Sequence, residues 1–127
     1  MGLMDLFGKK KPEAKEAPTA VDYVDWLLQH MLNTSQLTLT LDTRRALPDS
    51  SKLAADEAPP PCMPDAAIVV NRLKILAGVN PVRQTTPIEG TFERPRKHLS
   101  VVTTCRFQDN EAYSTCAIRL VIKGLNA

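Results

Sequence analysis

The stretch RLKILAGVNPVRQTTPIEG, residues 72–90, determines much of the fold that we expect for this chain of 127 residues. Its first part belongs to an amphipathic helix that should begin at Pro64-Asp65, with Asp65 as its cap, and end at residue 77. Gly78 follows at the position where a glycine usually ends a helix, and we assign Gly90 to a turn. The predicted buried face of the helix is Val69, Leu73 and Leu76, flanked by Ile68 and Ile75, with Asn71, Arg72 and Lys74 outside.

A second helix is predicted upstream, over residues 19–33. Thr19-x-x-Asp22 resembles a capping box at its start. Apolar residues then recur at helical spacing and predict a core stripe: Val21, Val24, Leu27, Leu28 and Met31. Three further side chains, Tyr23, Trp26 and His30, lie on a different side of the helix. Either the helix is covered on both sides, or these three residues form a docking surface for a partner.

The remaining pattern is that of strands and loops. SQLTLTLD, residues 35–42, alternates leucines with polar residues and predicts a half-buried strand with its leucines inward. Residues 43–63, rich in proline and alanine, predict a long surface loop. Strands are expected near residues 87–94, 99–107 and 113–122. In the last two, alternate residues form apolar faces that should lie on the same, buried side of the sheet: Leu99, Val101, Thr103, Cys105 and Phe107, and Cys116, Ile118, Leu120 and Ile122. A turn centred on Asn110-Glu111 would place Cys105 opposite Cys116 as two buried thiols.

Composition and motifs limit the classes of function. A net charge of +2 predicts no nucleic-acid binding. The three cysteines are not spaced like the ligands of a zinc site, and the five glycines form no phosphate-binding loop motif. We therefore predict no metal and no cofactor. The longest apolar runs are too short to cross a bilayer, so we expect no stable membrane insertion and a cytoplasmic protein. Residues 1–18 are predicted to be a flexible leader.

Together these signals predict one α+β domain over residues 19–127. Two helices, near 19–33 and 65–77, should pack on an antiparallel sheet that includes residues 36–41 and the final hairpin. The loop 43–63 interrupts this domain.

Residues 72–90 also resemble the segment "RLK-x-x-A-x-x-D-x-x-x-x-R-x-P-Q-D-G" in the N-terminal domain of type II secretion and type IV pilus ATPases. The alignment has no gap, and it matches Arg72, Leu73, Lys74, Ala77, Pro87 and Gly90. Residues 35–40, SQLTLT, fall where the family has Ser-Asp-Ile-His-Ile-Glu, and later strands fall on Val101–Arg106 and Ala117–Leu120. The resemblance covers residues 20–122 and implies a PAS-like two-layer domain.

Several family features are replaced in this chain. Gln36, Thr38 and Thr40 stand where the family has acidic and histidine side chains, and Val101 and Thr85 stand where it has arginines. In the resembling ATPases this domain moves against the nucleotide-binding core and contributes arginines towards the nucleotide. Of those cations, Arg119 and the pair Arg72 and Lys74 carry over. No Walker motif occurs in the sequence.

Three classes of function therefore compete. The first is a non-catalytic interaction or regulatory module of a secretion or pilus machine. Its partner would be a protein, for example the motor ATPase, its contact residues Tyr23, Trp26 and His30, and self-association stays open. The second is a small-ligand or cyclic-dinucleotide sensor, with an anion site formed by Arg94, Arg96, Lys97, His98 and Arg119. The third is a hydrolytic enzyme, against which we decide because no nucleophile is placed beside a base.

Overall fold

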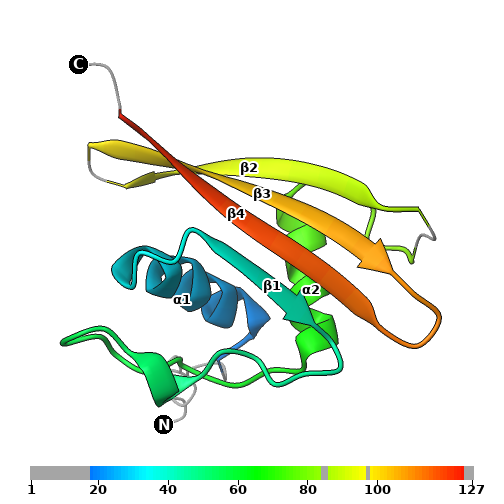
Figure 1. The fold of residues 1–127 in the computed structure, drawn as a ribbon, viewed down its shortest axis with the longest axis horizontal. Helices are drawn as coiled ribbons and strands as arrows, with labels where there is room; N and C mark the ends of the chain where they lie inside the picture. The colour runs from blue at the N-terminus through cyan, green and yellow to red at the C-terminus, as the bar shows by residue number, and fades with distance from the viewer. Residues whose placement is uncertain (1–17, 84–85, 97, 125–127) are drawn as a thin grey trace, which may run out of the picture.

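The computed structural model describes residues 18–83, 86–96 and 98–124 of the chain. Two helices and four strands follow one another in this part: α1 (Ala20–Asn33), β1 (Thr38–Asp42), α2 (Ala66–Leu76), β2 (Ile88–Arg96), β3 (Leu99–Asp109) and β4 (Ser114–Gly124). The helices pack on one side of the sheet, and β4 and β1 run in front of α2 in Figure 1. The predicted α+β fold, two helices on an antiparallel sheet, is confirmed.

The sheet has the strand order β1-β4-β3-β2, and every neighbouring pair is antiparallel. Its two faces differ in polarity because side chains alternate along each strand. The face towards the helices carries the buried side chains Val101, Thr103, Cys105, Phe107, Cys116, Ile118 and Leu120. In the described part of the chain the helices cover this face alone, and we call the opposite face the open face of the sheet.

The hairpin of β3 and β4 has the predicted faces but a different register. Phe107 pairs with Cys116, and Cys105 pairs with Ile118, so the predicted pairing of Cys105 with Cys116 is wrong by two residues. The reason is the turn: Asp109 pairs with Ser114, and the Asn110 N–H donates to the carbonyl oxygen of Tyr113 at 2.7 Å. A four-residue loop thus replaces the two-residue turn that we had centred one position earlier.

The helix ends follow the sequence signals in most respects. The Thr19 N–H donates to the carboxylate of Asp22 at 2.9 Å, which confirms the capping interaction at α1. Gly78 has a φ of 73°, and the Val79 N–H donates to the carbonyl oxygen of Lys74 at 2.8 Å, as expected for a left-handed cap. Asp65 caps α2 through its backbone carbonyl, whereas its side chain makes no cap hydrogen bond.

The buried face of α2 is rotated relative to our prediction. Val69, Val70, Leu73 and Lys74 are buried, whereas Ile68 and Ile75 are 52% and 55% exposed. The periodicity of an almost wholly apolar helix does not indicate which side faces the core, because several stripes fit equally well. Here α2 contacts both α1 and the sheet, and the buried face is the one shared by these two contacts.

Gly90 lies inside β2 and not in a turn, where the strand crosses the end of α2. A Cβ atom at this position would be 2.4 Å from the carbonyl oxygen of Ala77 and 2.8 Å from Cγ2 of Val79. The position therefore requires a residue without a side chain. This close approach explains why the stretch that begins in α2 ends on a glycine.

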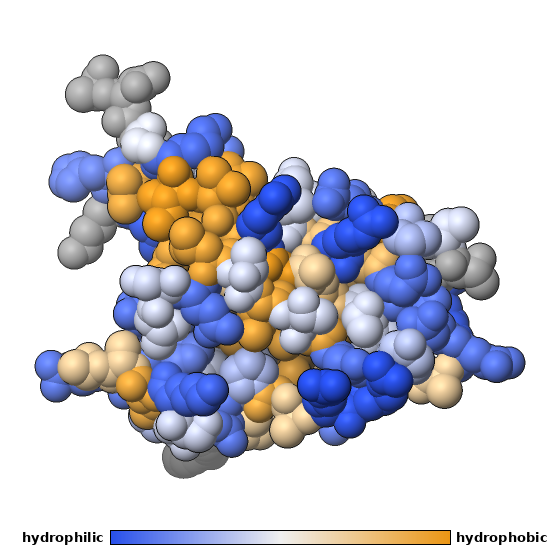
Figure 2. Space-filling view, in the orientation of Figure 1, coloured by the Kyte–Doolittle hydropathy of each residue, from blue (hydrophilic) through white to orange (hydrophobic). Residues whose placement is uncertain are grey.

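The sheet extends past the helices where β3 begins and β4 ends (Figure 1). Figure 2 shows apolar surface gathered over this end of the sheet. Leu99 in β3 and Ile122 in β4 are 43% and 46% exposed. We had assigned both residues to the buried face; they have the right orientation, but no described helix reaches them. In the same way Val21 and Leu37 are exposed and Leu39 is half-buried, so Leu41 is the one fully buried leucine of β1.

Candidate interaction site

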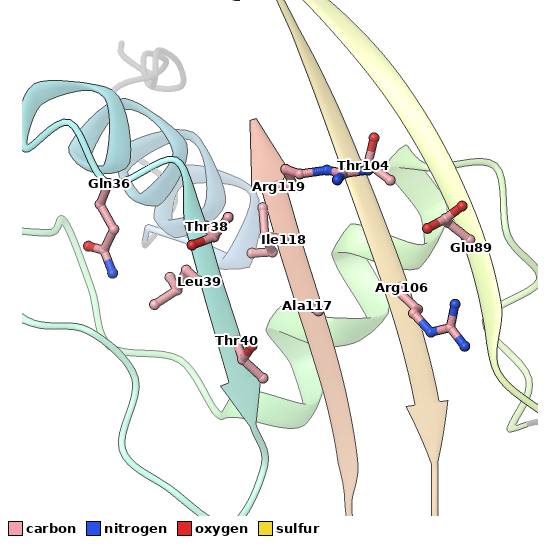
Figure 3. Close-up of a pocket in the computed structure, with 10 residues that line it drawn as sticks. All are labelled: Gln36, Thr38, Leu39, Thr40, Glu89, Thr104, Arg106, Ala117, Ile118 and Arg119. Atoms are coloured by element: carbon pink, nitrogen blue, oxygen red, sulfur yellow. The ribbon is translucent and has the colours of Figure 1, made fainter. Parts of the chain in front are cut away.

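The open face of the sheet forms a shallow trough of about 550 Å³. Its floor is made by outward-facing side chains of all four strands, among them Thr38, Thr40, Glu89, Thr104, Arg106 and Arg119. Figure 3 shows these side chains on the same surface, with Arg119 reaching from β4 across to Thr104 on β3. Because the strands alternate, this polar set follows directly from the burial of its neighbours on the other face.

Two arginines give the trough its chemistry. Arg119 pairs in register with Thr104 on one side and Thr38 on the other, and Arg106 pairs with Glu89 on β2. Both arginines are exposed, and neither makes an ion pair with another residue in the described part of the chain. The Arg119 guanidinium, with Thr104 and Thr38 on the neighbouring strands, can bind a carboxylate or another planar anion through two parallel hydrogen bonds, whereas Arg106 has Glu89 and Ala117 as its neighbours.

The three residues proposed as a docking surface lie under the chain's own loop. Tyr23 is 0% exposed and donates from its hydroxyl to the carbonyl oxygen of Pro48, and the Trp26 indole donates to that of Ala58 at 2.9 Å. Trp26 stacks on His30 with ring centroids 4.7 Å apart. The structure thus gives the first of our two alternatives, a helix covered on both sides, with residues 47–58 supplying the second cover.

His30 and Glu57 hold this loop against α1. Nδ1 of His30 lies 2.9 Å from the Glu57 carboxylate, and both side chains are about 95% buried. Burial alone would raise the pKa of Glu57, but hydrogen bonds from the Ala54 N–H, Asn33 and His30 bring it below its ordinary value. Burial also raises the pKa of the Tyr23 hydroxyl, and the nearby charge of Asp49 raises it further. The residues that looked like contact groups therefore have structural partners.

The predicted anion set does not converge on one place. Arg94 lies on the helix side of β2, where it forms an ion pair with Asp25 of α1 and lies over the ring of Phe92. Arg119 is on the opposite face of the sheet. His98 is exposed in the turn after Arg96, and Lys97 lies outside the described residues. The sheet therefore separates Arg94 and Arg96 from Arg119, so these residues cannot bind one small anion together.

A buried ion pair was missed by the sequence analysis. Lys74, which we had placed on the outside of α2, is buried, and its Nζ lies 2.8 Å and 3.2 Å from the two carboxylate oxygens of Asp109. Both side chains are 4% exposed. This pair ties the last turn of α2 to the end of β3. A lysine among apolar residues on a helix, with a single acid before the hairpin turn, was the signal for it.

Cys105 and Cys116 are buried free thiols, as predicted, although they are diagonal and not opposite one another. The hydrogen bond with Cys105, and then burial, raise the pKa of the Cys116 thiol well above its ordinary value, so it stays protonated. Among the described residues, no three His, Cys, Asp or Glu side chains are grouped so that they could hold a metal ion. No helix within residues 18–83 is long and apolar enough to cross a membrane.

No protein-family model matches this sequence, and no curated protein matches it. The trough is an exposed, polar surface with two arginines, and it offers hydrogen-bond and charge contacts to another molecule.

Proposed function

We propose that this protein is a non-catalytic interaction or regulatory module of a type II secretion or type IV pilus type machine, and that it acts in the cytoplasm. The observation that carries the proposal is the open, arginine-bearing face of the sheet. A polar face is ordinarily satisfied by water, but two arginines without ionic partners in the described chain give this face a defined chemistry for binding another protein.

The resemblance to the secretion ATPases supports this proposal at the level of residues. The chain has the order helix, strand, helix and three strands, and residues 72–90 run from α2 into β2. Three of the matched residues have structural roles: Ala77 and Gly90 allow the close crossing of α2 and β2, and Lys74 forms the buried ion pair. Arg119 is the matched cation that faces the trough. What this chain shares with the resembling domain is thus mainly packing, with one exposed arginine.

A test of binding should compare charge reversals inside and outside the trough. We expect the protein to co-purify with a motor ATPase or another component of such a machine, and Arg119→Glu to weaken the association at least tenfold. Arg83→Glu makes the same change of charge at an exposed position away from the trough, and it should have less than a twofold effect. An equal loss of binding in both variants would show that the trough is not part of the interface.

A test of activity should measure phosphate release by the purified protein. We expect no ATP hydrolysis by this chain alone, because phosphoryl transfer needs a phosphate-binding loop, a magnesium ligand and a group that orients water. Any effect should be on the rate of a complete motor added in the same assay. Turnover that survives repurification and increases with the concentration of this protein would overturn the non-catalytic assignment.

A second candidate function is a sensor of a small anionic ligand, such as a cyclic dinucleotide. The observation that favours it is the size of the trough, about 550 Å³, with arginines on two neighbouring strands. Isothermal calorimetry with cyclic dinucleotides and with ATP tests it. Binding that is lost in Arg119→Ala and kept in Arg96→Ala would place the ligand in the trough, whereas loss in Arg96→Ala would restore the basic turn as the site.

A further inference from the structure

The outer edge of β1 differs from the other edge of the sheet in its protection against pairing. β2, the opposite edge strand, has Glu89, Glu93, Arg94 and Arg96 on its two faces and Pro95 within it. Charges and proline are the usual protection of an edge strand against pairing with another chain. β1, with the sequence TLTLD, has no proline, and its one charge, Asp42, stands at its end and is paired with Arg44.

Main-chain groups of β1 point away from the sheet at alternate residues. The Leu120 N–H donates to the carbonyl oxygen of Leu37, and the Thr43 N–H to that of Ser114, so the odd-numbered residues bond to β4. The N–H and C=O groups of Thr38 and Thr40 therefore face outward. They have no main-chain partner within residues 18–83, 86–96 and 98–124. These groups repeat about every 6.8 Å, the spacing that an added strand requires.

Depressions lie on both sides of this edge. The trough is on the open face, and a groove of about 740 Å³ runs between β1 and the loop that covers α1. Gln36, Leu39 and Thr40 line both. On the helix side the groove offers apolar contacts from the half-buried Leu39 and Pro48 and the exposed Ala46, whereas the trough offers Arg119 one strand away from the edge. Figure 3 shows Thr38 and Thr40 on β1 among the side chains that line the trough.

We propose that β1 binds an extended segment of a partner protein as a fifth strand, in which apolar and acidic residues alternate. Alternate side chains of such a strand point to opposite faces of the sheet. The apolar ones enter the groove beside Leu39, Ala46 and Pro48, and the acidic ones lie over the trough towards Arg119. Main-chain hydrogen bonds to Thr38 and Thr40 provide the docking, and the two depressions provide the selectivity. This inference rests on the proposed function as an interaction module and specifies how the partner is held.

The experiment uses the full chain and a synthetic hexapeptide that alternates valine and glutamate, followed by NMR titration and amide hydrogen exchange. In the free protein, the amides of Thr38 and Thr40 should exchange rapidly. The peptide should shift these amide resonances and slow their exchange at least tenfold, while the amides of β2 stay unchanged. Protection of Thr38 and Thr40 before any peptide is added would mean that the chain itself, or a second copy of it, fills the edge, and would overturn the proposal.

Variants separate the backbone contact from the charge contact. Thr40→Pro removes one outward N–H and should lower the affinity for the peptide at least tenfold, whereas Thr91→Val, on the same face but in β2 and outside the trough, should change it less than twofold. Replacing glutamate by lysine in the peptide should weaken binding severalfold. Peptide affinity unchanged by Thr40→Pro would refute the added strand. If Thr40→Pro does not fold, the exchange pattern of the wild-type protein decides alone.

Two results distinguish failure of this docking mode from failure of the proposed function. Peptide binding at β1 without capture of any secretion or pilus component would keep the docking mode and refute the proposed machine. Capture of such a component that is equally strong in Thr40→Pro would keep the machine and refute the docking mode.

Discussion

Replacing Gly90 by alanine tests the contact between α2 and β2 most directly. The added Cβ would lie 2.4 Å from the carbonyl oxygen of Ala77 and 2.8 Å from Cγ2 of Val79. Ordinary contacts of a carbon atom with oxygen or carbon are about 3.3 to 4.0 Å, so α2 and β2 would have to separate by about 1 Å. The Val79 side chain can rotate away, but the Ala77 carbonyl belongs to the backbone at the helix end and cannot.

The expected magnitude follows from this geometry. Overpacking a tight site costs about 1 to 3 kcal/mol, and we expect a loss of about 3 kcal/mol because the backbone itself must move. For a domain of this size that corresponds to a melting temperature lower by about 10 °C. Gly78→Ala gives a comparison, since its φ of 73° is strained for alanine but no atom lies within 4 Å; it should cost about 1 to 2 kcal/mol.

Thermal unfolding followed by circular dichroism measures all of these variants. Gly124→Ala is the matched control, because its Cβ would meet no atom within 4 Å at an ordinary backbone conformation, and it should change stability by less than about 0.5 kcal/mol. The expected order of destabilisation is Gly90, Gly78, Gly124. A Gly90→Ala protein that melts within 2 °C of the wild type, or above Gly78→Ala, would show that β2 and α2 do not cross as closely as described.

Three further changes test the core and its charges. Leu73→Ala should destabilise the protein by about 2 to 5 kcal/mol and the exposed Asn71→Ala by less than about 0.5 kcal/mol, so equal urea midpoints would mean that the wrong face of α2 is buried. Lys74→Ala removes the buried cation beside Asp109 and should cost about 3 to 5 kcal/mol; in a double-mutant cycle with Asp109→Ala the losses should be far from additive, and additive losses would exclude the pairing. The hydrogen bonds and charge of Arg44 lower the pKa of Asp42 to about 2, so this carboxylate contributes stability above its ordinary pKa of about 3.9 and loses that contribution as the pH falls through about 2. The difference in urea midpoint between wild type and Asp42→Asn should therefore be present at pH 5 and small at pH 2; a difference that does not depend on pH would contradict the pairing.

Sequence patterns predicted the elements well because local rules govern them. The Thr19 cap, the left-handed Gly78 and the alternation in β3 and β4 each depend on neighbouring residues, and the structure has all three. Errors arose where distant segments meet. Lys74 is buried because Asp109 reaches it from the hairpin, and no periodicity within α2 encodes that partner.

The candidate site was harder to predict for the same reason. The sequence of α1 suggested that its aromatic side chains are exposed, because the residues that cover them, Pro48, Glu57 and Ala58, belong to a proline-rich loop distant in sequence. Arg94 and Arg119 lie on opposite faces of the sheet, and the face to which each side chain points is determined by how the strands pair across the sheet. By contrast, the polar character of Thr38 and Thr40 could be read from the alternation of β1.

The position of β1 in the sheet has a consequence for how the chain acquires its structure during synthesis. β2, β3 and β4 follow one another as hairpins and can pair as soon as each is made, whereas the partner strand of β1 in the described sheet is β4, more than half the chain away. Contacts between residues so far apart in sequence form slowly, because the intervening chain must first be ordered. On a ribosome, which adds about 5 to 20 residues per second, β1 leaves the exit tunnel seconds before its partner strand exists. During that interval both edges of TLTLD are unpaired, so a chaperone or a binding partner that takes up extended strands would meet this segment before β4 does.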